Sequence, residues 1–133
     1  MKRSTEIAAT VQRFYDALNT GDAETVTDLM STADGMLMIG TDPDEWITDH
    51  KTMTDLLAAQ VSSGVKVRGG DLQAFEEGTV GWMSDRAAFI LPDGTDVPVR
   101  FTGVLRKEDG QWRMIQSHAS LAVSNEEGLG VDV

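Results

Sequence analysis

The sequence of 133 residues contains no cysteine, which removes disulfides, thiolate metal ligands and cysteine nucleophiles together. It also contains no apolar run near the roughly 20 residues that a membrane-spanning helix needs. The first residues, from Met1 to Glu6, lack the long apolar segment of a secretory signal. We therefore expect a cytoplasmic protein without a membrane partner, folded without metal or covalent cross-links.

Positive charge is scarce, because 11 Lys and Arg residues stand against 22 Asp and Glu residues, for a formal net charge of −11. The acidic residues are spread along the chain, which indicates a solvated surface. Such a surface repels the phosphates of nucleic acids, so we expect no nucleic-acid partner. The sequence also lacks the spacing of a zinc site, an EF-hand loop or a phosphate-binding glycine loop, and we expect no metal and no cofactor.

Helical spacing of apolar residues dominates the first half of the chain. The first helix is predicted between Ser4 and Gly21, a second begins at Asp22, and a third lies between Asp49 and Gly64. The first helix has one apolar side, formed by Ile7, Val11, Phe14 and Leu18. A short strand over residues 36–39 and an acidic loop over residues 40–46 lie between the second and third helices.

The second half of the chain alternates as strands do, and three glycine-containing turns divide it. Four strands are predicted in an antiparallel meander, over residues 68–76, 79–91, 95–107 and 111–123. The turns are Glu76-Glu77-Gly78, Pro92-Asp93-Gly94 and Glu108-Asp109-Gly110, and each is predicted to be a three-residue hairpin loop. Such loops pair Leu91 with Thr95 and Lys107 with Gln111.

This register predicts an apolar inner face, which should pack on the helices, and a mixed outer face. The inner face would carry Ala87, Phe89, Val97, Val99, Phe101, Gly103, Leu105, Ile115, Ser117, Ala119 and Leu121. The outer face would carry Pro98, Arg100, Thr102, Val104, Arg106, Trp112, Met114, Gln116, His118 and Ser120. Trp112 and Met114 among polar residues form a reasonable interface centre, so we expect a homodimer through this outer sheet face.

Three stretches, residues 11–22, 40–46 and 109–120, are similar to SnoaL-like proteins of the nuclear transport factor 2-like superfamily. The resemblance implies an α+β fold shaped like a cone, with three N-terminal helices packed on a curved antiparallel sheet around a pocket. We expect a single SnoaL-like domain over residues 1–123, followed by an acidic C-terminal tail over residues 124–133.

Ketosteroid isomerases of this fold use a tyrosine on the first helix, an acid on a later strand and a carboxylate base. The resemblance puts these roles at Phe14, at Thr102 or Gly103, and at Ile39 or Gly40. None of these residues can perform its role, which argues against steroid isomerisation.

The candidate ligand-binding residues, expected to line an apolar pocket, are Phe14, Tyr15, Met38, Trp46, Phe101 and Ser117. Trp46 is expected either to cover the pocket mouth or to fill the core beneath the loop. The leading hypothesis is a protein that binds a small apolar molecule. The alternative is an isomerase, dehydratase or hydrolase acting on a small hydrophobic substrate, with His118 or Tyr15 as the proton carrier. A third hypothesis is an assembly module resembling the hub domain of calcium/calmodulin-dependent kinase.

Overall fold

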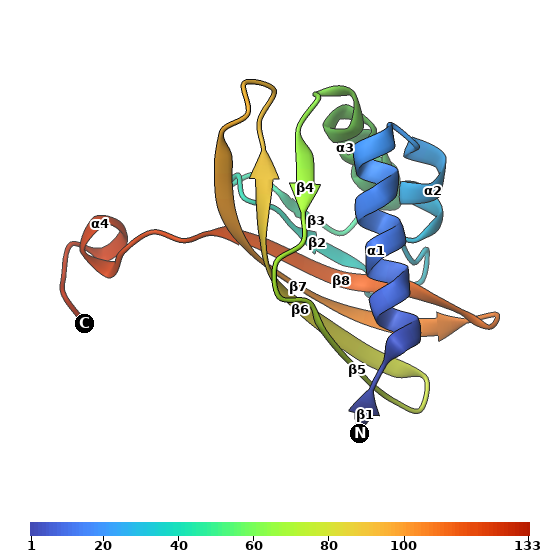
Figure 1. The fold of residues 1–133 in the computed structure, drawn as a ribbon. Helices are drawn as coiled ribbons and strands as arrows, with labels where there is room; N and C mark the ends of the chain where they lie inside the picture. Colours follow the sequence, from blue (N-terminus) through green and yellow to red (C-terminus); the bar gives the residue numbers. More distant parts are fainter.

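The structure is a computed structural model that describes residues 1–133. Its elements in chain order are β1 (Lys2–Arg3), α1 (Thr5–Thr20), α2 (Ala23–Asp28), β2 (Leu37–Ile39), β3 (Trp46–Ile47), α3 (His50–Ser62), β4 (Lys66–Arg68), β5 (Gln73–Glu77), β6 (Val80–Ile90), β7 (Asp96–Glu108), β8 (Gln111–Leu121) and α4 (Asn125–Leu129). Helices α1, α2 and α3 cover one face of a curved sheet (Figure 1). The predicted α+β fold with three N-terminal helices is therefore confirmed.

The ends of the helices follow from their capping residues. The hydroxyl oxygen of Ser4 accepts a hydrogen bond of 3.0 Å from the Ile7 amide and so caps α1. Gly21, with φ of 80°, ends α1 in the left-handed conformation that glycine adopts without strain. Asp22 caps α2, and Asp49 caps α3 through the Thr52 amide at 2.8 Å.

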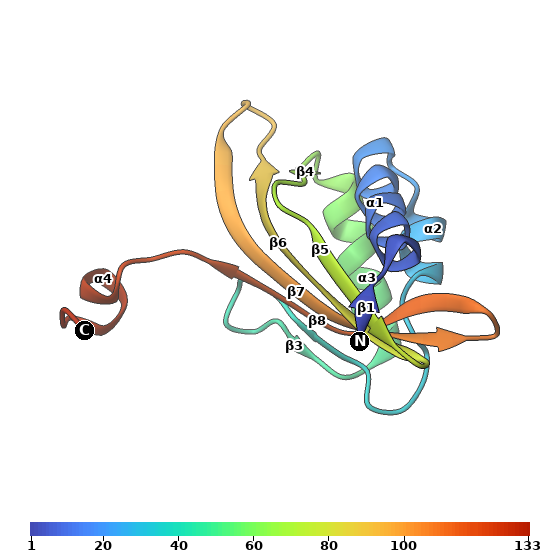
Figure 2. The ribbon, with the colours of Figure 1, turned by 60° about the horizontal axis from the view of Figure 1, so that its bottom comes forward.

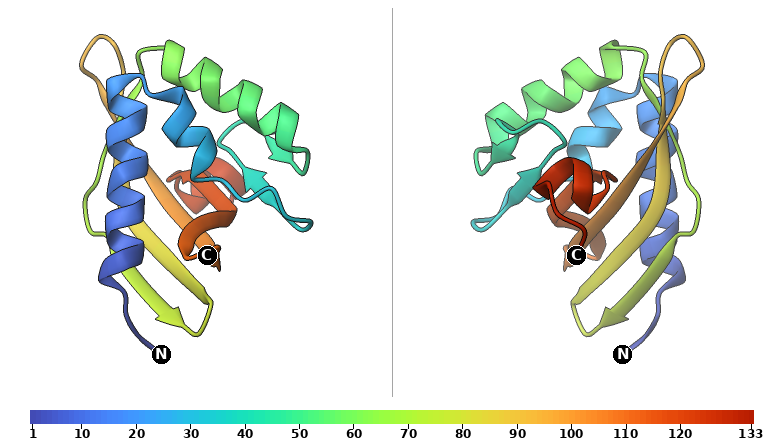
Figure 3. Two further views of the ribbon diagram at one scale, coloured as in Figure 1. Left: turned by 90° about the vertical axis from the view of Figure 1, so that its right-hand side faces the viewer. Right: turned by 90° about the vertical axis from the view of Figure 1, so that its left-hand side faces the viewer.

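The sheet contains eight strands in the order β1-β5-β6-β7-β8-β2-β3, with β4 also paired to β6. It curves around α1, as Figures 2 and 3 show from two further directions. Every pair is antiparallel except β2 with β8, which runs parallel and places Met38 beside Ser117. The predicted strand over residues 68–76 is wrong in detail, because β4 and β5 are separate strands on either side of Gly69 and Gly70.

The register of the β6–β7 hairpin matches the prediction. Phe89 pairs with Val97 and Ala87 with Val99. The three-residue loop has Gly94 at φ of 90°, and the Leu91 amide donates to the Thr95 carbonyl. The glycine supplies the positive φ that this loop type requires.

The predicted register of the β7–β8 hairpin is wrong. Its turn contains only Asp109 and Gly110, both with positive φ, and Glu108 pairs with Gln111. Two central residues with positive φ form a type I′ turn, the loop that a neighbouring Asp and Gly favour. A bulge between Val104 and Leu105 then shifts the pairing by one further residue.

The corrected register moves two large side chains to the face that meets the helices. Trp112 and Met114, predicted on the outer face, are buried against the helices. The indole of Trp112 donates a hydrogen bond of 3.0 Å to Glu6 on α1. Phe101 pairs with Ala119 rather than Ser117, and Gly103 with Ser117 rather than Ile115. The shorter turn shifts the register by one residue and the bulge shifts it by one more. Because side chains alternate between the faces, a total shift of two residues leaves Phe101 and Ser117 on the inner face, as predicted.

The outer face, defined as the sheet face turned away from α1, α2 and α3, contains one long cross-strand row. This row runs over Trp46, Ile39, His118, Thr102, Ser84 and Gln73. Beside it, Arg86 lies directly opposite Arg100. After Leu121 the chain leaves the sheet on the side away from the helices, and α4 stands apart from the rest of the molecule (Figure 1).

Candidate functional site

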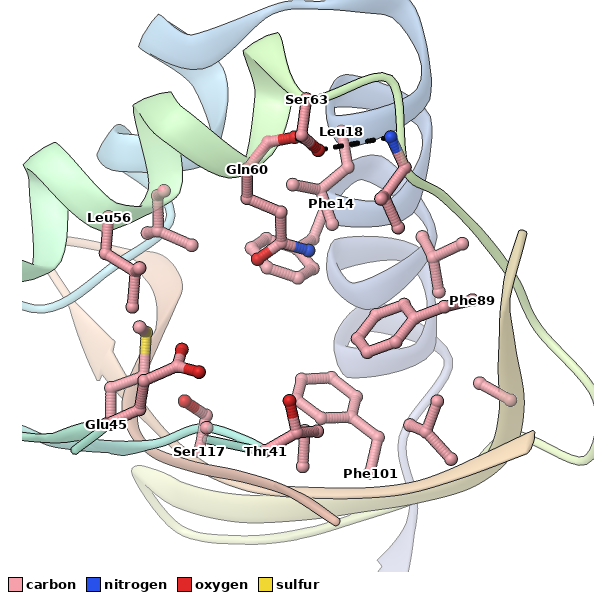
Figure 4. Close-up of a pocket in the computed structure, with 18 of the residues that line it drawn as sticks. Phe14, Leu18, Thr41, Glu45, Leu56, Gln60, Ser63, Phe89, Phe101 and Ser117 are labelled. Carbon is pink, nitrogen blue, oxygen red and sulfur yellow. Dashed lines mark hydrogen bonds between the residues drawn. The ribbon is translucent and has the colours of Figure 1, made fainter. Parts of the chain in front are cut away.

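A cavity of about 450 Å³ lies between α1, α3, the β2–β3 loop and the inner face of the sheet. Of its 23 lining residues, 17 are hydrophobic. This volume lies in the range of small-molecule sites, which are mostly apolar with a few polar groups. The long strands β6, β7 and β8 curve away from the helices at this end, and their inner-face side chains leave the space unfilled (Figure 4).

Aromatic rings form one wall of the cavity. Phe14 of α1 stacks on Phe101 of β7, with ring centroids 6.3 Å apart and an angle of 13° between the ring planes. Tyr15 lies 6.3 Å from the same Phe101 ring at a tilted angle. Phe89 of β6 extends this wall, as Figure 4 shows. Such a surface suits an aromatic or aliphatic ligand.

Tyr15 turns its hydroxyl away from this space to a buried carboxylate. The hydroxyl donates a hydrogen bond of 2.8 Å to Oδ2 of Asp85, while Oδ1 of Asp85 accepts from the amides of Gly70 and Asp71 at 3.1 and 2.7 Å. Burial raises the pKa of Tyr15 far above its usual value, and the bond to Asp85 raises it further. The phenol therefore stays protonated and uses its proton in the hydrogen bond to Asp85, so it does not act as a base in the cavity.

Glu45 is the acidic residue among the lining side chains, and no Lys, Arg or His lines the cavity. Its Oε1 accepts a hydrogen bond of 3.0 Å from the Asp42 amide. Its other oxygen, Oε2, lies over Gly40, where any Cβ would overlap it. Figure 4 shows the carboxylate pointing into the cavity near Thr41 and Ser117.

Gln60 of α3 is a second polar group that faces this space. Its amide points into the cavity in Figure 4 and makes no hydrogen bond with the protein. Ser63 is already engaged, because its hydroxyl donates to the Gln60 carbonyl at 2.6 Å and accepts from the Val65 amide at 3.2 Å. Glu45 and Gln60 are therefore the long polar side chains available to a ligand.

The predicted lining residues Phe14, Tyr15, Met38, Phe101 and Ser117 do line the cavity. Trp46 does not, and this placement corrects the prediction. It begins β3, pairs with Ile39 on the outer face, and is 66% exposed. Neighbouring side chains on a strand point to opposite faces of the sheet. Ile47 points inward and is buried, so Trp46 points outward. His118 is exposed on the outer face and does not line the cavity.

Three functional candidates were missed in the sequence. Asp85 lies two residues before Ala87 on the same strand, so the alternation that placed Ala87 inward also predicts an inward carboxylate there. Gln60 lies four residues after Leu56 and three after Leu57 on α3. The helical period therefore puts it on the same side of the helix as these apolar residues, facing the cavity. Glu45 had no such signal, because its direction depends on the folded geometry of the β2–β3 loop.

No group of three or more His, Asp or Glu side chains is arranged to hold a metal ion. No helix has the length and apolar character required to cross a membrane.

A family model described as a SnoaL-like domain matches residues 7–124 of the chain. The chain belongs to the SnoaL-like family. The match covers most of the sequence, from the first buried residue of α1 to just beyond the last strand of the sheet. None of the curated proteins is significantly similar to the chain in sequence.

Solved structures share the same architecture at low sequence identity. A protein of unknown function described as NTF2-like, from Pseudomonas putida KT2440, superimposes with a TM-score of 0.80 at 16% identity, over 92% of this chain and 89% of its own. A candidate dehydratase of the NTF2-like family from Streptomyces avermitilis has a TM-score of 0.75 at 18% identity, over 90% and 95% of the two chains.

A third structure, a candidate calcium/calmodulin-dependent protein kinase II association domain from Xanthomonas campestris, has a TM-score of 0.76 at 21% identity, over 92% and 95% of the chains. The three names differ in function, and at these identities the likeness extends to the fold alone.

Proposed function

We propose that this SnoaL-like protein is a cytoplasmic protein that binds a small, largely apolar molecule in the cavity. The observation that carries the proposal is a space of about 450 Å³ lined mainly by hydrophobic side chains. Protein interiors are normally close-packed, so an apolar space of this size that the chain's own side chains leave unfilled suits a small ligand. The stacked pair Phe14 and Phe101 offers a flat apolar surface for such a ligand.

A fluorescence titration tests this proposal. The neutral dye N-phenyl-1-naphthylamine gains fluorescence in apolar surroundings, and we expect saturable binding with one site per chain. Ala119 lines the cavity, so Ala119→Phe should fill the space and weaken dye binding at least about tenfold. Ala58→Phe is the matched control, because Ala58 is exposed on α3 and does not line the cavity. Equal binding by both variants would contradict the proposal.

An enzyme remains the second candidate because one observation favours it. The carboxylate of Glu45 lies over Gly40, one of the positions where the family resemblance puts the isomerase base. The rest of an acid–base set is less well supported, since Phe14 carries no hydroxyl and the Tyr15 proton is committed to Asp85. If the parent protein converts a substrate and Glu45→Gln loses that activity while its dye affinity is unchanged, the enzyme would be favoured over the binding protein.

We propose further that the protein is a homodimer through the outer face. Trp112 and Met114 no longer support this interface, but other residues on that face do. Trp46 is 66% exposed there, and interface centres are enriched in tryptophan and arginine. Arg86 makes no ion pair, and Arg100 makes only a hydrogen bond of 3.3 Å to Ser120. Both arginines lack a carboxylate partner within the chain, so their guanidinium groups are free to donate hydrogen bonds across such an interface.

A further inference from the structure

The cavity is divided into a polar end and an apolar end. Glu45, Thr41 and Ser117 lie together at one end, while Phe89, Phe101 and Phe14 lie toward the other (Figure 4). A ligand with one polar group would therefore have a preferred direction in this space. Its apolar part would lie between the phenylalanine rings and its polar group would approach Glu45.

The carboxylate of Glu45 is held in place by its own loop. The Gly40 amide donates to the Glu45 carbonyl at 2.9 Å, and the Glu45 amide donates to the Asp42 carbonyl at 2.9 Å. The Asp42 amide then donates to Oε1 of Glu45 at 3.0 Å. Gly40 leaves room for the side chain, because a Cβ there would lie 2.7 Å from Cδ of Glu45. The carboxylate is thus oriented before any ligand arrives.

Only part of the acceptor capacity of this carboxylate is used. Oε1 accepts one hydrogen bond, and Oε2 accepts none from the protein. Glu45 makes no ion pair, and no cationic side chain lines the cavity. A half-buried carboxylate without a cation near it attracts a hydrogen-bond donor, and most strongly a positively charged one. It repels a second anion, and the apolar walls screen that repulsion poorly.

We propose that the cavity selects a hydrophobic molecule whose polar end donates a hydrogen bond to Glu45, with an ammonium group preferred over a hydroxyl and a carboxylate rejected. This inference rests on the proposed function, because it assigns the chemical class of the ligand that the cavity binds. Fatty acids and other apolar anions are therefore excluded as ligands, although their chains would fit an apolar space. The amide of Gln60, which makes no hydrogen bond with the protein, faces the cavity from α3 on the side opposite Glu45 (Figure 4).

The test uses three molecules with the same eight-carbon chain, namely octylamine, 1-octanol and octanoate. Each is titrated against protein that carries bound N-phenyl-1-naphthylamine, and the concentration that displaces half of the dye is measured at pH 7. We expect octylamine to displace the dye at a concentration at least about tenfold lower than octanoate, with octanol between them. Octanoate displacing the dye as well as octylamine does would overturn the proposal.

Two variants separate the effect of Glu45 from the net charge of the protein. Glu45→Gln keeps an oxygen that can accept from the Asp42 amide, and it should reduce the preference for amine over carboxylate at least about tenfold. Asp44→Asn is the matched control, because it removes one negative charge from the same loop but does not line the cavity. Equal effects of the two variants would overturn the proposal in favour of a general charge effect. Failure of the dye itself to bind would overturn the proposed function and this inference together.

Discussion

The hydroxyl of Tyr15 on α1 donates a hydrogen bond of 2.8 Å to the carboxylate of Asp85 on β6, and both side chains are buried. The other oxygen of Asp85 receives the amides of Gly70 and Asp71, which connect β4 to β5. One carboxylate on β6 therefore holds together α1 and the segment that connects β4 to β5. The ring of Tyr15 lines the cavity, but Asp85 does not, so the hydrogen bond between them supports the aromatic wall from behind.

Asp85→Ala should lower the free energy of unfolding by about 1–3 kcal/mol, because it leaves the buried Tyr15 hydroxyl and two part-buried amides without their acceptor. Asp85→Asn keeps an oxygen for some of these donors and should cost less. Urea unfolding followed by circular dichroism measures both values. A loss below about 0.5 kcal/mol for the alanine variant would show that the network contributes little to stability.

Tyr15 is the one tyrosine of the chain, so the ultraviolet absorbance of tyrosinate reports on this residue alone. Its pKa is raised by burial and by the bond to Asp85. The native protein should show no tyrosinate signal through pH 11, whereas the chain in urea should titrate near pH 10. Since the folded state keeps a proton that the unfolded chain loses above about pH 10, stability should fall with rising pH in that range.

The variant Tyr15→Phe provides the control for this titration. Its stability should change less between pH 9 and pH 11 than that of the parent protein, because the titrating group is gone. A native tyrosinate signal with a midpoint near 10 would mean that the hydroxyl is exposed and not bound to Asp85.

The dimer prediction depends on Trp46, which is 66% exposed on the outer face. Trp46→Ala should weaken dimerisation at least about tenfold in sedimentation equilibrium, because truncating a hot-spot tryptophan at an interface costs about 2 kcal/mol or more. Stability of the monomer should change little, since the side chain is largely exposed. Leu129→Ala is the control, because Leu129 is 67% exposed on α4, which stands apart from the sheet (Figure 1). A parent protein that sediments as a monomer at about 100 μM would remove the dimer altogether.

Local signals predicted the helices and one hairpin of this fold well. Capping residues mark the helix ends as predicted, with Ser4 and Asp49 at the start of α1 and α3 and Gly21 at the end of α1. Gly94 has the positive φ expected in its hairpin loop. These features depend on a few neighbouring residues. They can therefore be predicted without knowing which parts of the chain meet in space.

The β7–β8 hairpin shows where such reasoning failed. Asp109 with Gly110 also fits a two-residue turn, and the choice of loop length decides the register of the whole pair. The bulge after Val104 has no local signal, because it depends on how the bent strands pack Trp112 and Met114 against the helices. The inward direction of Glu45 likewise arises from loop hydrogen bonds that spacing alone does not predict.

The last prediction concerns the glycine beneath Glu45. Gly40 does not have a positive φ, so alanine fits its backbone, but the new Cβ would lie 2.7 Å from Cδ of Glu45. The new Cβ would also lie 2.8 Å from Cβ of Glu45, so rotation of that side chain alone cannot relieve the overlap. We expect the β2–β3 loop to shift as well and the free energy of unfolding to fall by about 1–3 kcal/mol. With the carboxylate displaced, the preference for octylamine over octanoate should fall toward that of Glu45→Gln, while dye affinity stays within about threefold. Gly128→Ala on α4 is the control, since its Cβ meets only Val123 at 3.4 Å. An unchanged preference in Gly40→Ala would mean that the position of the Glu45 carboxylate does not set the ligand class.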